Sequence, residues 1–343
     1  MIKILKRKKV VAVLEGRLVA VRGYRVYQST DGGQTWSCYA KVDDTKNRLL
    51  GLTPLSRRLT RAEITKLYVM KDGTEFCIAR KGIFRKDKGI HRFVKCFDIK
   101  KGSRPNSILI DEEKNKIYFG EYYINYAKAP MNIYCSDDRG ENWHVVYTFA
   151  EGIINHIHGV FKDPYTGYLW VITGDRENEC IIGYTKDEFK TFDVLYRGGQ
   201  DYRSCVLFFY KDYVVYATDS QYQQCQIKKI DRKTNEITVI QDVQGPVIKG
   251  SQCGDFAILA TDVEPSDFNH ETHAYAWYSN DGLNWKQLYG AEKDHWHQKY
   301  FQFGTFDLPQ YYVEDVENVY ISGKALKKID GDTLVFKREK NRL

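Results

Sequence analysis

The sequence predicts an all-β fold, and three observations predict it: an aromatic-rich composition, short apolar runs, and a motif that recurs about every fifty residues. The 343 residues include 26 Tyr, 17 Phe and 6 Trp against 3 Met and 7 Pro, and aromatic side chains pack well on pleated sheets. With 43% hydrophobic and 28% charged residues, the chain is globular, which excludes the disordered, collagen-like and bilayer-spanning classes.

The recurring motif is a short turn that combines Ser or Thr, Asp, a glycine and an aromatic residue. It stands at residues 29–36, 136–143 and 279–285, and at 185–192 with Phe in place of Trp. The Ser and Asp oxygens can accept hydrogen bonds from nearby amides, the glycine accepts a positive φ, and the aromatic ring folds back over the hairpin. With three weaker copies, the motif marks seven units 44 to 56 residues apart, at Asp31, Asp87, Asp138, Asp187, Asp231, Asp281 and Asp330.

Each unit holds several short apolar runs, as at residues 116–120, 132–135 and 144–147. Such spacing predicts a four-stranded antiparallel meander. A meander cannot cover both of its faces alone, so neighbouring units must stack around an axis. We therefore expect one domain, residues 1–343, folded as a seven-bladed β-propeller with four-stranded blades. Ring closure would pair residues 2–5 or 10–14 with 334–337, and the sequence leaves both open.

The turn pattern Ser-x-Asp-x-Gly-x-Thr-Trp resembles the Asp-box, or bacterial neuraminidase repeat, of sialidase-like β-propellers. The resemblance implies an arginine cluster for a substrate carboxylate, a Tyr nucleophile polarised by a carboxylate, and an Asp acid/base. Arg104 and Arg203, with one of Arg57, Arg58 or Arg61, could supply the arginines. The Arg-Ile-Pro signature of such sialidases is absent, so sialidase activity itself is not expected.

Successive antiparallel strands alternate in direction, so the loops before the inner strands and the ends of the second strands share one face, while the Asp-containing turns lie on the other. We expect the turns to be structural and the polar residues of the first face to form a glycan site at the channel mouth. Capping of strand ends is the alternative role for each acid. The predicted catalytic residues are His158, Asp175, Tyr202 and Arg203, and the predicted substrate-binding residues are Arg104, Asn106, Glu121, His156, Asp219, Asp262 and His297.

The expected function is binding and cleavage of an acidic glycan or oligosaccharide, by hydrolysis or by elimination. Elimination would resemble that of propeller-type polysaccharide lyases, in which Arg and His neutralise a uronate and Tyr or His removes the C5 proton. The alternative is a non-catalytic propeller that binds carbohydrate or protein, because the sequence has no nucleophile elbow, P-loop, dinucleotide fingerprint or HExxH.

No metal and no cofactor is expected. A His-x-His pair such as His156 and His158 is expected to give only one ligand to a given site, although one His with the ring of acids could hold a divalent cation. The net charge is +7, but the densest basic runs lie at the two ends, Lys3 to Lys9 and near the C-terminus, where solvated tails are expected rather than a nucleic-acid surface.

The eight cysteines have no CxxC spacing, which predicts free, mostly buried thiols in a reducing cytoplasm. The apolar stretch 10–14 is too short for a signal peptide, so neither export nor a membrane span is expected. The oligomeric state stays open.

Overall fold

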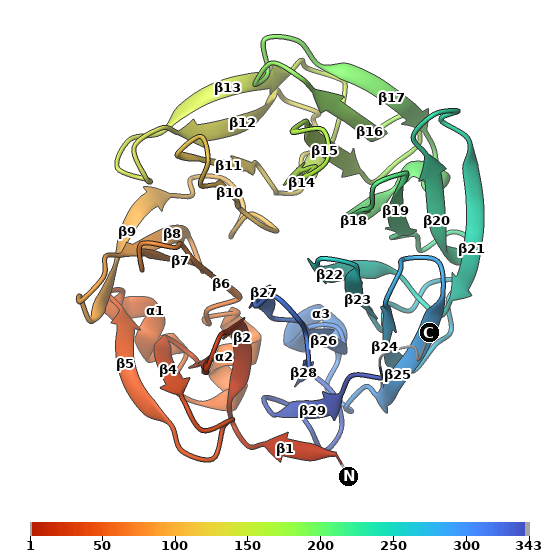
Figure 1. Ribbon diagram of the computed structural model, residues 1–343. Helices are drawn as coiled ribbons and strands as arrows, with labels where there is room; N and C mark the ends of the chain where they lie inside the picture. Colours follow the sequence, from red (N-terminus) through yellow and green to blue (C-terminus); the bar gives the residue numbers. More distant parts are fainter. Residues whose placement is uncertain (1, 340–343) are drawn as a thin grey trace.

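The computed structural model describes residues 2–339 as antiparallel meanders that follow one another around a central axis (Figure 1). Four meanders form separate four-stranded sheets in chain order, with the first strand nearest the axis. They are β10 (Leu109–Asp111), β11 (Lys116–Gly120), β12 (Met131–Ser136) and β13 (His144–Phe149); β14 (His156–Lys162), β15 (Leu169–Gly174), β16 (Cys180–Thr185) and β17 (Asp193–Gly198); β18 (Ser204–Phe209), β19 (Tyr213–Thr218), β20 (Cys225–Asp231) and β21 (Ile237–Val243); and β22 (Val247–Cys253), β23 (Phe256–Thr261), β24 (His273–Ser279) and β25 (Trp285–Glu292).

A nine-stranded sheet holds two further meanders. Its strands are β2 (Lys9–Leu14), β3 (Arg17–Arg22), β4 (Arg25–Ser29) and β5 (Ser37–Val42), then β6 (Lys66–Val69), β7 (Glu75–Ala79), β8 (Gly82–Lys86) and β9 (Arg92–Asp98), with β27 (Gln310–Tyr312) added to β2 in parallel. A parallel pairing of Lys41 with Arg92 and Val42 with Phe93 joins β5 to β9. Residues 2–339 therefore form six hydrogen-bonded sheets, whereas the sequence predicts seven. The number is lower because the pairing of β5 with β9 joins two meanders into one sheet.

The remaining sheet closes the ring with strands from both ends of the described chain. It orders β26 (Thr305–Asp307), β28 (Asn318–Lys324), β29 (Thr333–Lys337) and β1 (Lys3–Leu5) from the axis outward. Lys3 pairs with Val335 and Leu5 with Thr333, so the first of the two predicted closures is the one present.

This closure makes the predicted equivalence of Asp330 wrong. The other marker aspartates lie between the third and fourth strands of their meanders, whereas Asp330 lies between β28 and β29, the second and third strands. The fourth strand of this sheet is β1, so no turn of the chain leads out of β29 toward it. The Asp330 carboxylate instead accepts the amide N–H of Ala325.

The apolar layers lie between neighbouring meanders. Ile78 and Phe76 of one meander share a buried cluster with Ile117 and Phe119 of the next, and the same arrangement joins Trp170 and Ile172 to the following meander. Each meander is covered by its neighbours, as its two apolar faces require.

The predicted hydrogen bonds of the four strong turns are present. In the turn after β12, the Gly140 amide donates to Ser136 Oγ at 2.7 Å, the Asn142 amide donates to Asp138 Oδ1 at 2.8 Å, and Trp143 Nε1 donates to the Gly140 carbonyl at 3.2 Å. Gly140 has a φ of 85°, a conformation that favours glycine. The Trp143 ring packs edge-on against Phe97 and Phe119, so the turn anchors two meanders to each other.

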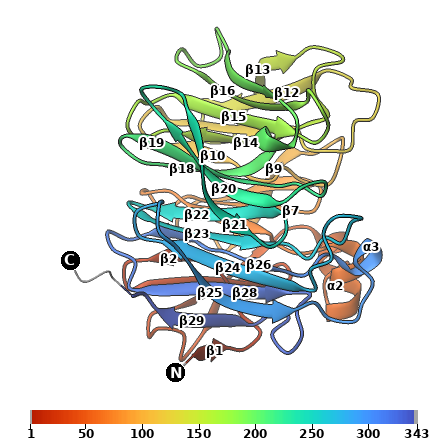
Figure 2. The ribbon, with the colours of Figure 1, turned by 90° about the vertical axis from the view of Figure 1, so that its right-hand side faces the viewer.

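Short helices precede inner strands on the opposite face from these turns. They are α1 (Thr45–Leu50), α2 (Pro54–Thr60), the 3₁₀ turn η1 (Gln200–Tyr202) and α3 (Gln298–Phe301), and α2 and α3 lie together at one side in Figure 2. None of the helices within residues 2–339 is long and apolar enough to cross a membrane.

The basic run at the start of the chain is not wholly a solvated tail. Lys9 is buried, lies 3.3 Å from Asp307 and donates to the Ile64 carbonyl. Residues 340–343, which carry part of the second run, lie outside the described residues. All eight cysteines are free, and five of them are buried, as predicted.

Replacing Trp143 with Ala should lower the free energy of unfolding by about 2–3 kcal/mol, because it removes a half-buried ring that bridges two meanders. Chemical denaturation monitored by circular dichroism measures the change. Trp296, which is 40% exposed, is the control, and Trp296→Ala should cost less than about 1 kcal/mol. Equal losses for the two variants would contradict the anchoring role of the turn.

Candidate functional site

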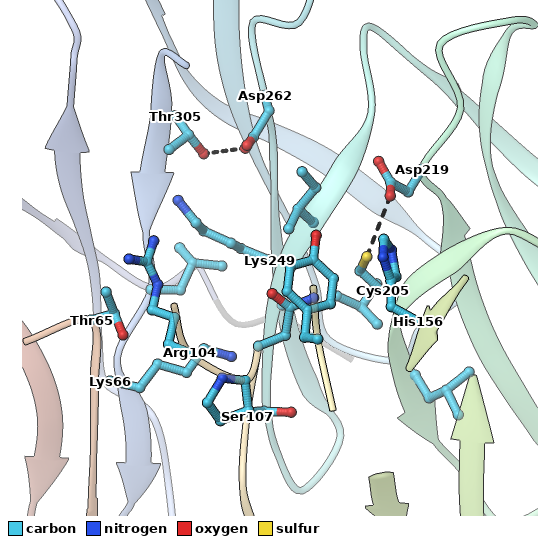
Figure 3. Close-up of a pocket in the computed structure, with 18 of the residues that line it drawn as sticks. Thr65, Lys66, Arg104, Ser107, His156, Cys205, Asp219, Lys249, Asp262 and Thr305 are labelled. Carbon is cyan, nitrogen blue, oxygen red and sulfur yellow. Dashed lines mark hydrogen bonds between the residues drawn. The ribbon is translucent and has the colours of Figure 1, made fainter. Parts of the chain in front are cut away.

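A cavity of about 830 Å³ lies among the inner strands. It reaches from the helix-bearing face, where these strands begin and the second strands end, to the far ends of β14, β18 and β22 at Phe161, Phe209 and Gln252. Its wall comes from several meanders and from the loop between β9 and β10 (Figure 3). One side of the wall carries histidines and carboxylates, and the other carries lysines and an arginine.

The first side is a connected cluster of His156, His158, Asp175 and Arg203. The two histidine Nε2 atoms are 3.0 Å apart, and each lies 3.2 Å from Asp175 Oδ1. Arg203 Nη2 lies 3.2 Å from the same oxygen, and its Nε lies 3.5 Å from Asp219 Oδ2. Both histidines and Arg203 are buried, so these charges interact with little screening.

Both histidines of this cluster come from β14. Residues two apart on a strand share a face, so the expectation that His156 and His158 cannot reach one site is wrong. The pairing of β14 with β15 also shifts register between Ile157 and Gly159, which makes His158 an extra residue in the strand. Gly174 of β15 leaves room for the ring, because a Cβ there would lie 2.5 Å from His158 Cε1.

The carboxylates of this cluster differ in proton affinity. Burial raises the pKa of Asp175, but the contacts with His156 and His158 outweigh it and hold that pKa below its usual range. Burial raises the pKa of Asp219 above the usual value despite the nearby Arg203. The Cys205 thiol donates to Asp219 Oδ2 at 3.4 Å, so Asp219 faces a weak donor as well as the guanidinium.

The opposite side of the cavity carries cations, two of which have no partner. Lys249 pairs with Asp307 at 2.8 Å. The side chains of Lys66 and Arg104 form no hydrogen bond and no ion pair with any residue of the described chain, and Arg104 Nη1 is buried. Asn106 Nδ2 and Ser251 Oγ, also in the wall, are buried without a partner.

Two groups in the wall have pKa values close to neutrality. Burial and the neighbouring Lys249 lower the pKa of Lys66 to about 8. Burial, with Asp219 and Asp262 nearby, raises the pKa of Glu264 to about 8. The first group can lose a proton and the second can donate one within the physiological range, which suits acid–base work.

The structure brings most of the predicted site residues together. Eight of the eleven line the cavity or, for His158, contact those that line it: Arg104, Asn106, His156, His158, Asp175, Arg203, Asp219 and Asp262.

Three predicted residues lie elsewhere for local reasons. Tyr202 stacks on Tyr196 with ring centroids 5.3 Å apart. Glu121 accepts the Asn132 amide at 2.8 Å and lines a separate cavity of about 50 Å³, so it caps a strand end. His297 caps α3 by accepting from the Lys299 amide.

Sequence reasoning missed Lys66, Lys249, Glu264 and Tyr122. Tyr122 lines the cavity and its ring lies 4.4 Å from that of His156. Lys249 and Tyr122 stand in the segments expected at the mouth, but nothing in the sequence separates them from their neighbours. Lys66 begins an inner strand, and only the position of the cavity gives it significance.

No family model and no curated protein matches the sequence. Solved structures do match the fold. An oligogalacturonate lyase in complex with manganese aligns with a TM-score of 0.62 and 8% identity over 99% of this chain and 91% of that one. YCF48 bound to a D1 peptide aligns at 0.57 and 12%, over 99% and 97%.

A GH74 enzyme of Niastella koreensis aligns with a TM-score of 0.54 and 13% identity, over 82% of this chain and 45% of that one. The chain thus spans less than half of the enzyme's length. At such identities the similarity shows the fold alone. The chain is all-β, built mostly of four-stranded antiparallel sheets, and its fold is that of a β-propeller.

Proposed function

We propose that this chain is a seven-bladed propeller of the Asp-box type, whose cavity binds and cleaves an acidic oligosaccharide. Counting the two meanders of the nine-stranded sheet separately supports seven blades. The hydrogen-bonded turns at Ser29, Ser136, Thr185 and Ser279 support the Asp-box assignment.

The observation that carries the function is the pair of unpartnered cations, Lys66 and Arg104, in the cavity wall. Both residues are partly buried, and a buried polar atom such as Arg104 Nη1 is costly without a partner. A ligand carboxylate or sulfate can supply that partner. Arg binds such groups through paired N–H donors. The free Asn106 amide and Ser251 hydroxyl suit the hydroxyl groups of a sugar, and about 830 Å³ is room for a short oligosaccharide.

Cleavage is assigned to the opposite side of the cavity. His156 and Asp175 line this side of the cavity beside Tyr122. The Glu264 carboxyl, with a pKa of about 8, is still protonated at neutral pH. In elimination, a cation neutralises the uronate, a base removes the C5 proton and an acid protonates the leaving oxygen. Hydrolysis would use the acid and an activated water instead. The oligogalacturonate lyase and GH74 enzymes among the similar folds are consistent with either reaction.

A glycan array with uronate-bearing, sulfated and neutral oligosaccharides tests the proposal, followed by mass spectrometry of the products. Elimination gives an unsaturated fragment that is one water lighter than the hydrolysis fragment. Binding without products would favour the non-catalytic scaffold. Binding of neutral oligosaccharides without any binding of the uronate-bearing or sulfated ones would refute the proposal of an acidic ligand.

Arg104→Ala should weaken binding of the best anionic oligosaccharide by about 10- to 100-fold, since a hydrogen bond to a charged group contributes about 1.5–3 kcal/mol. Isothermal titration calorimetry measures the change. Arg58 is the matched control, because its guanidinium is already held by Asp294 and the Phe301 carbonyl. Arg58→Ala should lower the melting temperature and leave the affinity unchanged. A loss of affinity confined to Arg58→Ala would contradict the role of Arg104.

Affinity for the same ligand should fall by about tenfold between pH 7 and pH 9, an effect of about 1.4 kcal/mol. Lys66 and Glu264 each have a pKa of about 8. When the pH is below this value Lys66 is a cation and Glu264 is neutral, and when the pH is above it Lys66 is neutral and Glu264 is an anion. Both changes make the cavity more negative as pH rises. The affinity of the Lys66→Met variant and that of the Glu264→Gln variant should each depend less on pH than the affinity of the wild type. The affinity of the wild type for a neutral oligosaccharide should not depend on pH. Affinity that rises with pH would refute this account.

A further inference from the structure

His156, His158 and Asp175 place three ligand atoms around one point. The Nε2 atoms of the two histidines are 3.0 Å apart, and each is 3.2 Å from Asp175 Oδ1. All three atoms are chemically suited to a divalent transition metal. The triad is buried on the side of the strand and open on the side of the cavity, where His156 and Asp175 form part of the wall.

The hydrogen bonds of the two Nδ1 atoms determine the tautomer and the orientation of each histidine ring. His158 Nδ1 lies 2.6 Å from the Ser204 carbonyl, and His156 Nδ1 lies 3.3 Å from the Tyr123 carbonyl. A carbonyl oxygen only accepts hydrogen bonds, so each Nδ1 must carry the hydrogen. In the neutral ring the lone pair then stands on Nε2. A histidine whose Nδ1–H is held by a carbonyl is the usual arrangement of a metal ligand.

The spacing fits three adjacent positions of an octahedron. Bonds of about 2.1–2.2 Å at right angles place ligand atoms about 3.0–3.1 Å apart, close to the observed separations. Two lone pairs and a carboxylate oxygen at these distances repel one another unless a cation lies between them. A metal ion capping the triad would satisfy all three and keep its remaining positions toward the cavity.

The surroundings hold the ligands in place. The bulge at His158 and the absence of a side chain at Gly174 fix the rings. Arg203 is the nearest competing cation, 3.2 Å from Asp175 Oδ1. Its Nε lies 3.5 Å from Asp219, so the guanidinium keeps a carboxylate when Asp175 binds a metal.

We propose that His156, His158 and Asp175 bind one divalent transition-metal ion as a facial triad, with the open coordination positions directed into the cavity. The site requires neither the acidic-glycan assignment nor a particular reaction. It goes beyond the function proposed above, because it adds a Lewis acid to a cavity that otherwise has only side-chain acids and bases.

Equilibrium dialysis of chelator-treated protein against MnCl₂ or ZnCl₂, with the bound metal quantified by mass spectrometry, tests the site without any sugar. The wild type should bind one ion per chain. His156→Ala, His158→Ala and Asp175→Asn should each weaken binding by at least about tenfold, since even an outer partner of a ligand contributes about 10- to 100-fold. The bound ion should also raise the melting temperature of the wild type but not of these variants.

His144→Ala is the matched control. His144, Cys135 and Asp137 form another group with ligand atoms close together, and His144 is exposed, so metal held there would be lost in this variant alone. Asp175→Asn keeps the size of the side chain and decides the matter if the alanine variants fail to fold. The proposal is overturned if the wild type binds neither ion, or if Asp175→Asn binds as the wild type does. In that case a shared proton, rather than a metal, joins the three groups.

Discussion

The burial of both faces of every meander is the constraint on which the structure depends. Clusters such as that of Phe76, Ile78, Ile117 and Phe119 are shared between neighbours, so no meander is complete by itself. A ring is the arrangement that leaves none uncovered, and it carries the start of every inner strand to the same place. Polar residues that are far apart in the chain, such as Lys66 and His156, then face one cavity (Figure 3).

The cavity separates charges rather than cancelling them. On one side Arg203 is balanced by Asp175 and Asp219; on the other Lys249 is balanced by Asp307, but Lys66 and Arg104 are left without partners in the described chain. Structural ion pairs stabilise a fold only when both members are present. The two cations without ion pairs are therefore the groups of the wall that the proposed anionic ligand would engage.

Sequence reasoning reached the architecture because a turn motif with a clear physical cause repeats along the chain. It also placed Arg104, Asp219 and Asp262 at one mouth, since strand direction decides which loops share a face. It fails for the pair His156 and His158, since residues two apart on a strand share a face, and for Asp330, which the strand exchange at the closure displaces. Tyr202 and His297 have the right composition for a site but are used by local stacking and capping.

The three-residue ladder between β1 and β29 has a consequence for how the molecule is made and how it comes apart. Lys3 and Val335 are partners, so this contact of the closed circle joins two strands that lie far apart along the chain. Contacts between residues so far apart in sequence cost much loop-closure entropy and form slowly. We therefore expect the pairing of β1 with β29 to form last during folding and to break first during unfolding. Its release would bare the outer edge of β29, and an unpaired strand edge is prone to join with a second chain.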